Sequence, residues 1–82
     1  MAKTNNIKDD IEKVEYYCEL FEKYKSFLTE SQSQAFQLYF IEDQSYADIA
    51  NITATTRAAA FDSVRKAINN LLKIEEKMNN NK

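Results

Sequence analysis

Neither glycine nor proline occurs anywhere in the 82 residues of this chain. These two residues normally mark the tight turns that connect β-strands, and glycine-rich loops cradle phosphate groups in many nucleotide-binding enzymes. Their absence excludes that kind of nucleotide site and predicts an all-α protein. A chain of this length can hold one small core. We therefore expect a single domain over residues 1–82, with polar, disordered ends at 1–8 and 79–82.

The first half of the chain has the apolar spacing of two helices. The first helix is expected to begin at Asp9 or Asp10. Its apolar face is formed by Val14, Tyr17, Cys18, Phe21, Tyr24 and Leu28. Thr29 and Gln32 then have the spacing of a capping box, in which two side chains satisfy backbone N–H groups at a helix start. The helix that follows is apolar around most of its circumference, which is typical of a central helix packed on both sides.

A short third helix and a fourth helix are predicted around a polar turn. Ser45 and Asp48 form a second capping box, and the helix that they open is expected to end at Ala50. Thr56 can cap the next helix, which begins after residues 51–55. The small side chain of Ala50 allows the two helices to cross closely. This pattern indicates a helix-turn-helix.

Charge is divided unevenly along the chain. Residues 9–48 hold ten acidic side chains and three lysines, whereas residues 56–73 hold Arg57, Arg65, Lys66 and Lys73 against Asp62 alone. In a helix-turn-helix, the start of the second helix is the part that enters a nucleic-acid groove. We therefore predict that Thr56, Arg57, Arg65 and Lys66 contact nucleic acid, with a simple solvated basic face as the alternative.

The last helix is predicted to be long, because nothing breaks it before the asparagine-rich end. Its apolar residues alternate four and three apart, as in a coiled coil, and are Ala60, Val64, Ala67, Leu71, Ile74 and Met78. This helix is longer than a helix-turn-helix requires. A packing seam of Val64, Leu71, Ile74 and Met78 would pack either on the first helix or on a second copy in a homodimer. Folding back onto the first helix is the simpler arrangement.

Four short motifs keep a fixed spacing, namely Leu28-Thr29-x-x-Gln32, Tyr39-Phe40-x-Glu42-Asp43, Ser45-x-x-Asp48-Ile49-Ala50 and Arg57-x-Ala59-x-Phe61-Asp62-x-Val64. From about Tyr17 to Ile74 the chain resembles the YlxM family of small bacterial helix-turn-helix proteins. The resemblance implies a four-helix domain similar to the promoter-reading C-terminal domain of bacterial sigma factors. It also implies a regulatory role in the signal recognition particle pathway, through contacts with the particle's GTPase or its RNA.

The chain departs from the family pattern around the turn. Thr53, Thr55 and Ala60 are less bulky or less apolar than the residues usual there, so Ile52 is expected to turn inward and replace some of the lost burial. Ala58 stands where relatives carry a glutamine, a side chain that can bond adenine through two hydrogen bonds. We therefore expect this chain to read duplex DNA with little base specificity.

Binding is favoured over catalysis. The chain has no histidine, and its one cysteine, Cys18, fits the pattern of a small buried apolar residue, so no enzymatic activity, metal or cofactor is expected. The aromatic side chains have helical spacing, so most of them are assigned to the core and none to base stacking.

Location and partners follow from the same features. No segment is long and apolar enough for membrane insertion and the first residues lack a signal-peptide core, so the protein is expected to be cytoplasmic. Three functions stay open: a regulator acting on the signal recognition particle, a transcription regulator that binds duplex DNA, and a helix-mediated protein interaction module.

Overall fold

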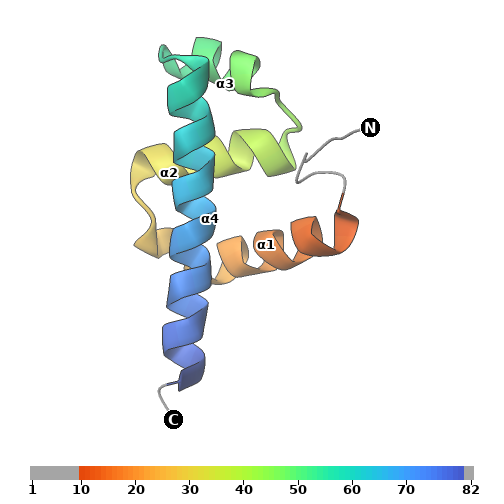
Figure 1. Ribbon diagram of the computed structural model, residues 1–82, viewed down its shortest axis with the longest axis vertical. Coiled ribbons are helices and arrows are strands. Elements are labelled where there is room, and N and C mark those ends of the chain that lie inside the picture. Colours follow the sequence, from red (N-terminus) through yellow and green to blue (C-terminus); the bar gives the residue numbers. More distant parts are fainter. Residues whose placement is uncertain (1–9, 81–82) are drawn as a thin grey trace.

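The computed structural model describes residues 10–80 and contains, in that part of the chain, four α-helices and no strand (Figure 1). The helices are α1 (Ile11–Tyr24), α2 (Glu30–Phe36), α3 (Tyr46–Thr53) and α4 (Arg57–Asn80). A short 3-10 helix, η2 (Lys25–Phe27), follows α1, and a π-helical segment, η3 (Gln37–Ile41), continues α2. The all-α fold and the long last helix are confirmed.

The expected disorder at residues 1–8 and at the last two residues falls outside the described residues. Helix α4 continues through Asn79 and Asn80, two residues that the sequence pattern places in the disordered C-terminal end. Asn79 supports this last turn, because its side-chain amide donates to Glu75 Oε2 at 3.2 Å, one turn earlier. None of the helices in residues 10–80 is long and apolar enough to cross a lipid bilayer.

Helix α4 is the axis on which the other three helices pack. Figure 1 shows α3 beside the N-terminal end of α4, whereas α1 and α2 cross α4 farther along its length. The side chains of Val64, Ala67 and Leu71 form the buried row of α4 and have no exposed surface. The sequence assigns the central place to the second helix; α4 holds it instead, because its apolar row is long enough to meet α1, α2 and α3.

Two phenylalanines join α1 to α2 in the centre of the core. Phe21 and Phe36 stack with their ring centroids 4.5 Å apart and an interplanar angle of 16°, and both are fully buried. Burying a side chain of this size stabilises the fold by about 1.5–3 kcal/mol. Around this pair the core is completed by Leu20, Leu28, Ala35, Leu38, Tyr39, Ile49, Ala50, Ala60, Val64, Ala67, Ile68 and Leu71.

Side-chain caps define the helix starts. In the first capping box, Thr29 Oγ1 accepts from the Gln32 N–H at 3.1 Å while Gln32 Oε1 accepts from the Thr29 N–H at 3.5 Å. In the second, Ser45 Oγ accepts from the Asp48 N–H at 3.1 Å and Asp48 Oδ2 from the Ser45 N–H at 3.4 Å. Both predicted capping boxes are confirmed. Asp10 caps α1 in the same way, by accepting from the Lys13 N–H at 3.2 Å.

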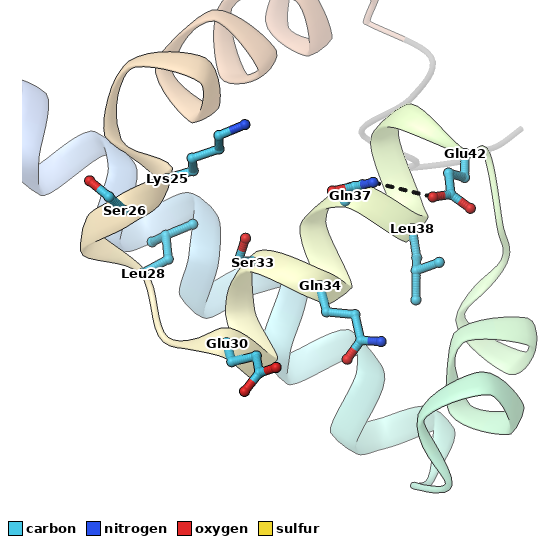
Figure 2. Close-up of a pocket in the computed structure, with 9 residues that line it drawn as sticks. All are labelled: Lys25, Ser26, Leu28, Glu30, Ser33, Gln34, Gln37, Leu38 and Glu42. Carbon is cyan, nitrogen blue, oxygen red and sulfur yellow. Dashed lines mark hydrogen bonds between the residues drawn. The ribbon is translucent and has the colours of Figure 1, made fainter.

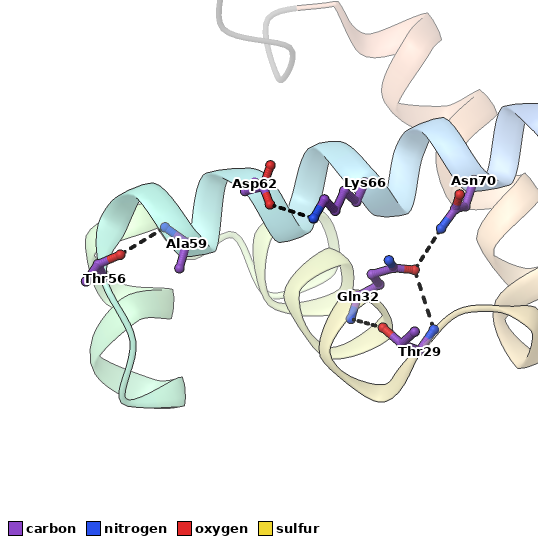
Figure 3. Close-up of polar contacts among 7 residues, drawn as sticks. All are labelled: Thr29, Gln32, Thr56, Ala59, Asp62, Lys66 and Asn70. Carbon is purple, nitrogen blue, oxygen red and sulfur yellow. Dashed lines mark hydrogen bonds and ion pairs between the residues drawn. The ribbon is translucent and has the colours of Figure 1, made fainter.

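Gln32 has a second function in the fold. Its Oε1 also accepts a hydrogen bond from the side-chain amide of Asn70, which lies on α4, at 2.9 Å (Figure 3). One oxygen atom therefore closes the cap of α2 and binds α4. Because this bond is directional, it restricts the rotation of α4 about its own axis relative to α2.

The predicted seam packs within the chain. Val64 and Leu71 are fully buried, Ile74 is half-buried, and Met78, at the far end, stays 50% exposed. The distal part of α4 packs against α1. There the Tyr24 hydroxyl donates to Glu75 Oε1 at 2.7 Å, and the Lys23 ammonium lies 3.9 Å from the same oxygen. The distal part of α4 therefore lies against the first helix, and Met78 does not take part in the buried seam.

Within residues 10–80, two residues have a positive φ, Asp43 at 59° and Ala54 at 57°, and Ala54 adopts the left-handed helical conformation. Asp43 follows the π-helical segment, and Ala54 ends α3. The left-handed region costs an alanine about 1–2 kcal/mol, because its Cβ atom approaches the backbone closely. The sequence gives no sign of either position, since turns of this kind are normally recognised by a glycine.

We expect Ala54→Gly to raise the free energy of unfolding by up to about 1 kcal/mol, because glycine lacks the Cβ atom that strains this conformation. Urea denaturation followed by circular dichroism measures the change. The matched control is Ala47→Gly, at an exposed helical position of α3, which should lower stability instead. Equal losses in both variants would mean that Ala54 is not strained.

The contact between Tyr24 and Glu75 predicts a pH dependence of stability. The hydrogen bond from Tyr24 lowers the pKa of the Glu75 carboxyl below its usual value. A carboxyl whose pKa is lower in the folded state contributes stability above its unfolded pKa, about 4.3, and this contribution is lost as pH falls through the folded value. Glu75→Gln and Tyr24→Phe should therefore both weaken the loss of stability on acidification.

Thermal melts between about pH 3 and pH 6 test this expectation, in the range where glutamate titrates. Glu76→Gln is the control, because Glu76 is the exposed neighbour of Glu75 on α4. An acid dependence unchanged in Glu75→Gln would show that this carboxyl is not linked to folding.

Candidate nucleic-acid interface

Helices α3 and α4 and the turn between them, residues 54–56, form the helix-turn-helix. Helix α3 ends at Thr53, three residues later than the predicted end at Ala50. The extra turn is stabilised locally, because Thr53 Oγ1 donates to the Ile49 carbonyl at 2.8 Å and lies 2.9 Å from Thr55 Oγ1. Both threonine hydroxyls are therefore engaged within the turn.

At the crossing of the two helices, Ala50 is buried as predicted, but Ile52 is not. Ala50 is buried where α3 packs against α4. Ile52 does not turn inward: it is 52% exposed, so the prediction that it replaces the lost bulk is wrong. Positions 50 and 52 lie about 200° apart around the helix, so Ile52 is not buried together with Ala50. Ile52 borders a hollow of about 280 Å³ that remains between the helices, lined also by Ile49 and Ala60, and does not fill it.

A larger hollow, shown in Figure 2, lies on another face of α2, and Gln34 borders both hollows. It measures about 590 Å³ and is lined by side chains of η2, α2 and η3. Its charged groups are of both signs, with Lys25 opposed by Glu30 and Glu42, and Gln37 Nε2 donates to Glu42 Oε2 at 3.3 Å. This mixture does not favour a polyanion, so the hollow is not part of the candidate interface.

Thr56 is the N-cap of α4, as predicted. Its Oγ1 accepts a hydrogen bond from the Ala59 N–H at 3.0 Å, and its carbonyl accepts from the Ala60 N–H at 2.9 Å (Figure 3). The cap uses one lone pair of the hydroxyl oxygen and leaves the hydroxyl proton able to donate. Thr56 can therefore cap the helix and contact a phosphate oxygen at the same time.

Arg57 lies in the first turn of α4 and is exposed. Among the described residues its side chain has no hydrogen-bond or ion-pair partner. The N-terminus of a helix carries a partial positive charge, so an arginine here gains nothing from the helix dipole. The charge of the Arg57 guanidinium and the partial positive charge of the helix N-terminus both attract an anion that approaches this end of α4.

The other two predicted cations differ in their surroundings. Lys66 forms an ion pair with Asp62 on the preceding turn, with Lys66 Nζ 3.1 Å from Asp62 Oδ2, and both side chains are exposed (Figure 3). Arg65 places its guanidinium carbon 5.6 Å from the centre of the Phe61 ring. Residues four apart on a helix are surface neighbours. Arg57 and Arg65 thus belong to one row with Phe61 between them, while Lys66 belongs to the next row, where Asp62 offsets its charge.

Phe61 was not among the residues predicted for the site. Its ring is 43% exposed and packs edge-on against Tyr46 of α3, with the centroids 5.3 Å apart. Tyr46 in turn stacks on Tyr39 at 4.5 Å. Burial and a hydrogen bond with Tyr39 raise the pKa of the Tyr46 hydroxyl above its usual value, so this hydroxyl stays protonated at neutral pH. The signal in the sequence is the placement of Phe61 four residues from an arginine on either side.

Two helices joined by a short turn, with the N-terminal turn of the second exposed and basic, define a helix-turn-helix protein. A family model described as "Putative helix-turn-helix protein, YlxM / p13 like" matches residues 11–82. The chain belongs to this family, UPF0122, which confirms the resemblance found in the sequence.

Several curated relatives carry the same family name. A UPF0122 protein of Mycoplasma capricolum is 37% identical over 78 residues, which cover 95% of this chain and 66% of the relative. Those of Clostridium novyi and Lactococcus lactis are 37% and 35% identical, over 73% and 84% of this chain and 52% and 62% of their own lengths. The chain thus spans between about half and two thirds of these relatives. No solved structure matches it significantly.

Removing the cap of α4 should loosen the candidate interface. Thr56→Ala is expected to lower the free energy of unfolding by about 0.5–2 kcal/mol, because the Ala59 N–H loses its acceptor. Urea denaturation gives the change, and Thr56→Ser, which keeps the hydroxyl, should stay close to the original chain. Identical stability of all three proteins would show that the cap does not hold the start of α4.

Proposed function

We propose that this chain is a regulatory binding protein whose helix-turn-helix contacts nucleic acid through the phosphate backbone. The observation that carries this proposal is the pair Arg57 and Arg65, exposed in one row at the start of α4 and not offset by an acidic side chain among the described residues. Along the helix axis the two are about 12 Å apart, so they can reach different phosphates of one strand. Thr56 adds a hydroxyl donor at the same end.

The first turn of α4 supports contacts to phosphate more than contacts to bases. Ala58 and Ala59, both exposed, follow Arg57. A methyl group can touch the thymine methyl but offers no hydrogen bond to a base edge. Phosphate contacts position a protein on nucleic acid without reading the sequence. We therefore infer a protein that recognises charge and shape, with little discrimination between base sequences.

The acidic half of the chain limits where a polyanion can bind. On the outer side of α1, Glu12, Glu15, Glu19 and Glu22 line one shallow hollow, and all four are exposed. Repulsion from this face directs a nucleic acid towards α4. Repulsion from the acidic face thereby helps to orient this small protein on a nucleic acid, although it has few cations.

The candidate partner that we propose first is the RNA of the signal recognition particle, with the particle's GTPase as the alternative. The family resemblance supports this pathway, and the weak provision for base reading favours RNA over a specific DNA operator. A role in the cytoplasm is part of the same proposal. Catalysis is not, because the chain has no histidine and burial, together with nearby Glu22, raises the pKa of the Cys18 thiol.

A transcription regulator of duplex DNA is the second candidate. It is favoured by the arrangement of α3 and α4, in which α4 presents its free N-terminal turn beside the supporting helix, as recognition helices do in the major groove. In this reading Arg57 remains the only long polar side chain of the first turn and could contact guanine.

Charge reversal tests the proposed function. For the original chain the slope of log affinity against log salt should be about −2 to −3, close to 0.9 per phosphate neutralised on duplex DNA and somewhat less on single strands. The double variant Arg57→Glu with Arg65→Glu should lose binding to RNA and to duplex DNA, as measured by fluorescence anisotropy. The triple reversal that adds Lys66→Glu should lose little more, because Asp62 already offsets Lys66.

The matched control reverses two lysines of the distal half of α4, Lys73→Glu with Lys77→Glu, and so changes the net charge equally. It should retain most of the affinity. Binding without salt dependence, or binding that survives the arginine reversal, would leave α4 a solvated face and make a protein partner the better explanation.

A further inference from the structure

We propose that Phe61 and Arg65 form a stacking platform for an unpaired nucleobase, so that the preferred ligand is single-stranded RNA. This inference rests on the proposed function and makes it more specific. Aromatic rings stack with bases of any sequence, and RNA is recognised mostly at unpaired positions whose bases can leave their own stack. Phe61 is the aromatic side chain that the candidate interface presents for such a contact.

The ring of Phe61 is exposed, yet its surroundings hold it in place. Tyr46 packs against it from α3, and Tyr46 is itself stacked on the buried Tyr39 with an interplanar angle of only 8°. A ring that is already oriented loses little conformational freedom when a base stacks on it. This distinguishes Phe61 from an aromatic side chain on a flexible loop.

The charges around Phe61 suit a nucleic-acid strand. Arg57 lies one turn before the ring and Arg65 one turn after it, each about 6 Å along the axis. Arg65 already holds its guanidinium 5.6 Å from the ring centre, an arrangement in which both planar groups can take part in stacking. The row therefore combines phosphate-binding cations with an aromatic surface, which is the combination that single-strand binding proteins use.

Two other exposed aromatic side chains lack this combination. Tyr16 lies among Glu12, Glu15 and Glu19 on the acidic side of α1, where a polyanion is repelled. Phe27 is 62% exposed in η2, but the nearby Lys25 ammonium lies over the buried ring of Phe21 instead. Exposure alone thus does not single out Phe61; its place between two arginines does.

The test compares Phe61→Leu with Phe27→Leu, an equally conservative change at a more exposed phenylalanine. Three probes are used: a short oligoadenylate RNA, an abasic oligomer of the same length, and a DNA duplex. Phe61→Leu should weaken binding of oligoadenylate by about 5- to 100-fold and leave the other two probes within about twofold. Its salt slope should equal that of the original chain, because no phosphate contact is lost. Phe27→Leu should bind all three probes normally.

Phe61→Trp provides a second readout that does not depend on affinity. The chain contains no tryptophan, so this variant has a single indole fluorophore at the platform. Stacking of a base should quench its fluorescence with oligoadenylate but not with the abasic oligomer. The variant should also retain the affinity of the original chain, since an aromatic ring is preserved.

The outcomes separate this inference from the function on which it rests. If oligoadenylate binds equally to Phe61→Leu and the original chain, or if all three probes weaken together with a lower melting temperature, Phe61 only supports Tyr46 and the platform is rejected. The phosphate-binding role then stands, provided that the double arginine reversal still abolishes binding. If the original chain binds none of the probes, the proposed function fails and the platform with it.

Discussion

The buried apolar row of α4 holds the four helices together. Val64, Ala67 and Leu71 give α1, α2 and α3 a common surface to pack against, and helices of this length are marginal in water without such packing. The same helix carries Arg57, Phe61 and Arg65 on its outer surface. Core and candidate interface are therefore two faces of one element, so that any loss of packing along α4 would also displace the side chains offered to a partner.

A series of aromatic contacts connects the centre of the core to that outer surface. Phe36 contacts Phe40 with ring centroids 4.6 Å apart, Phe40 contacts Tyr39 at 4.9 Å, and from Tyr39 the contacts pass through Tyr46 to Phe61. Aromatic pairs at such distances contribute about 0.5–1.5 kcal/mol beyond the area that they bury. The π-helical segment η3, which carries Tyr39 and Phe40, thus links α2 to the helix-turn-helix. The position of the exposed ring depends on residues far from it in the sequence.

Most of the fold could be predicted because its signals are local. The hydroxyl caps of α2, α3 and α4 and the periodic burial of α4 are properties of neighbouring residues, and each was found where expected. The end of α3 lies three residues beyond the predicted one, because the left-handed position that ends this helix is occupied by Ala54 and not by a glycine, the usual signal. Ile52 stays half exposed because its position lies about 200° around α3 from the buried Ala50, so helical periodicity outweighs the volume missing at the junction. In the site, the exposure of Arg57 was foreseeable, but that of Phe61 depends on how α3 meets α4, which no local pattern encodes.

The oxygen atom that Gln32 shares between Thr29 and Asn70 lies apart from the candidate interface, on the side of α4 that meets α2. Together with the buried row of α4, its bonds restrict the rotation of α4 about its axis and so help to fix the direction of the outer rows. Residues on those rows are then free to diverge between relatives without any rearrangement of the helices. The four helices thus form a rigid scaffold whose exposed side chains can be replaced to give a different recognition surface.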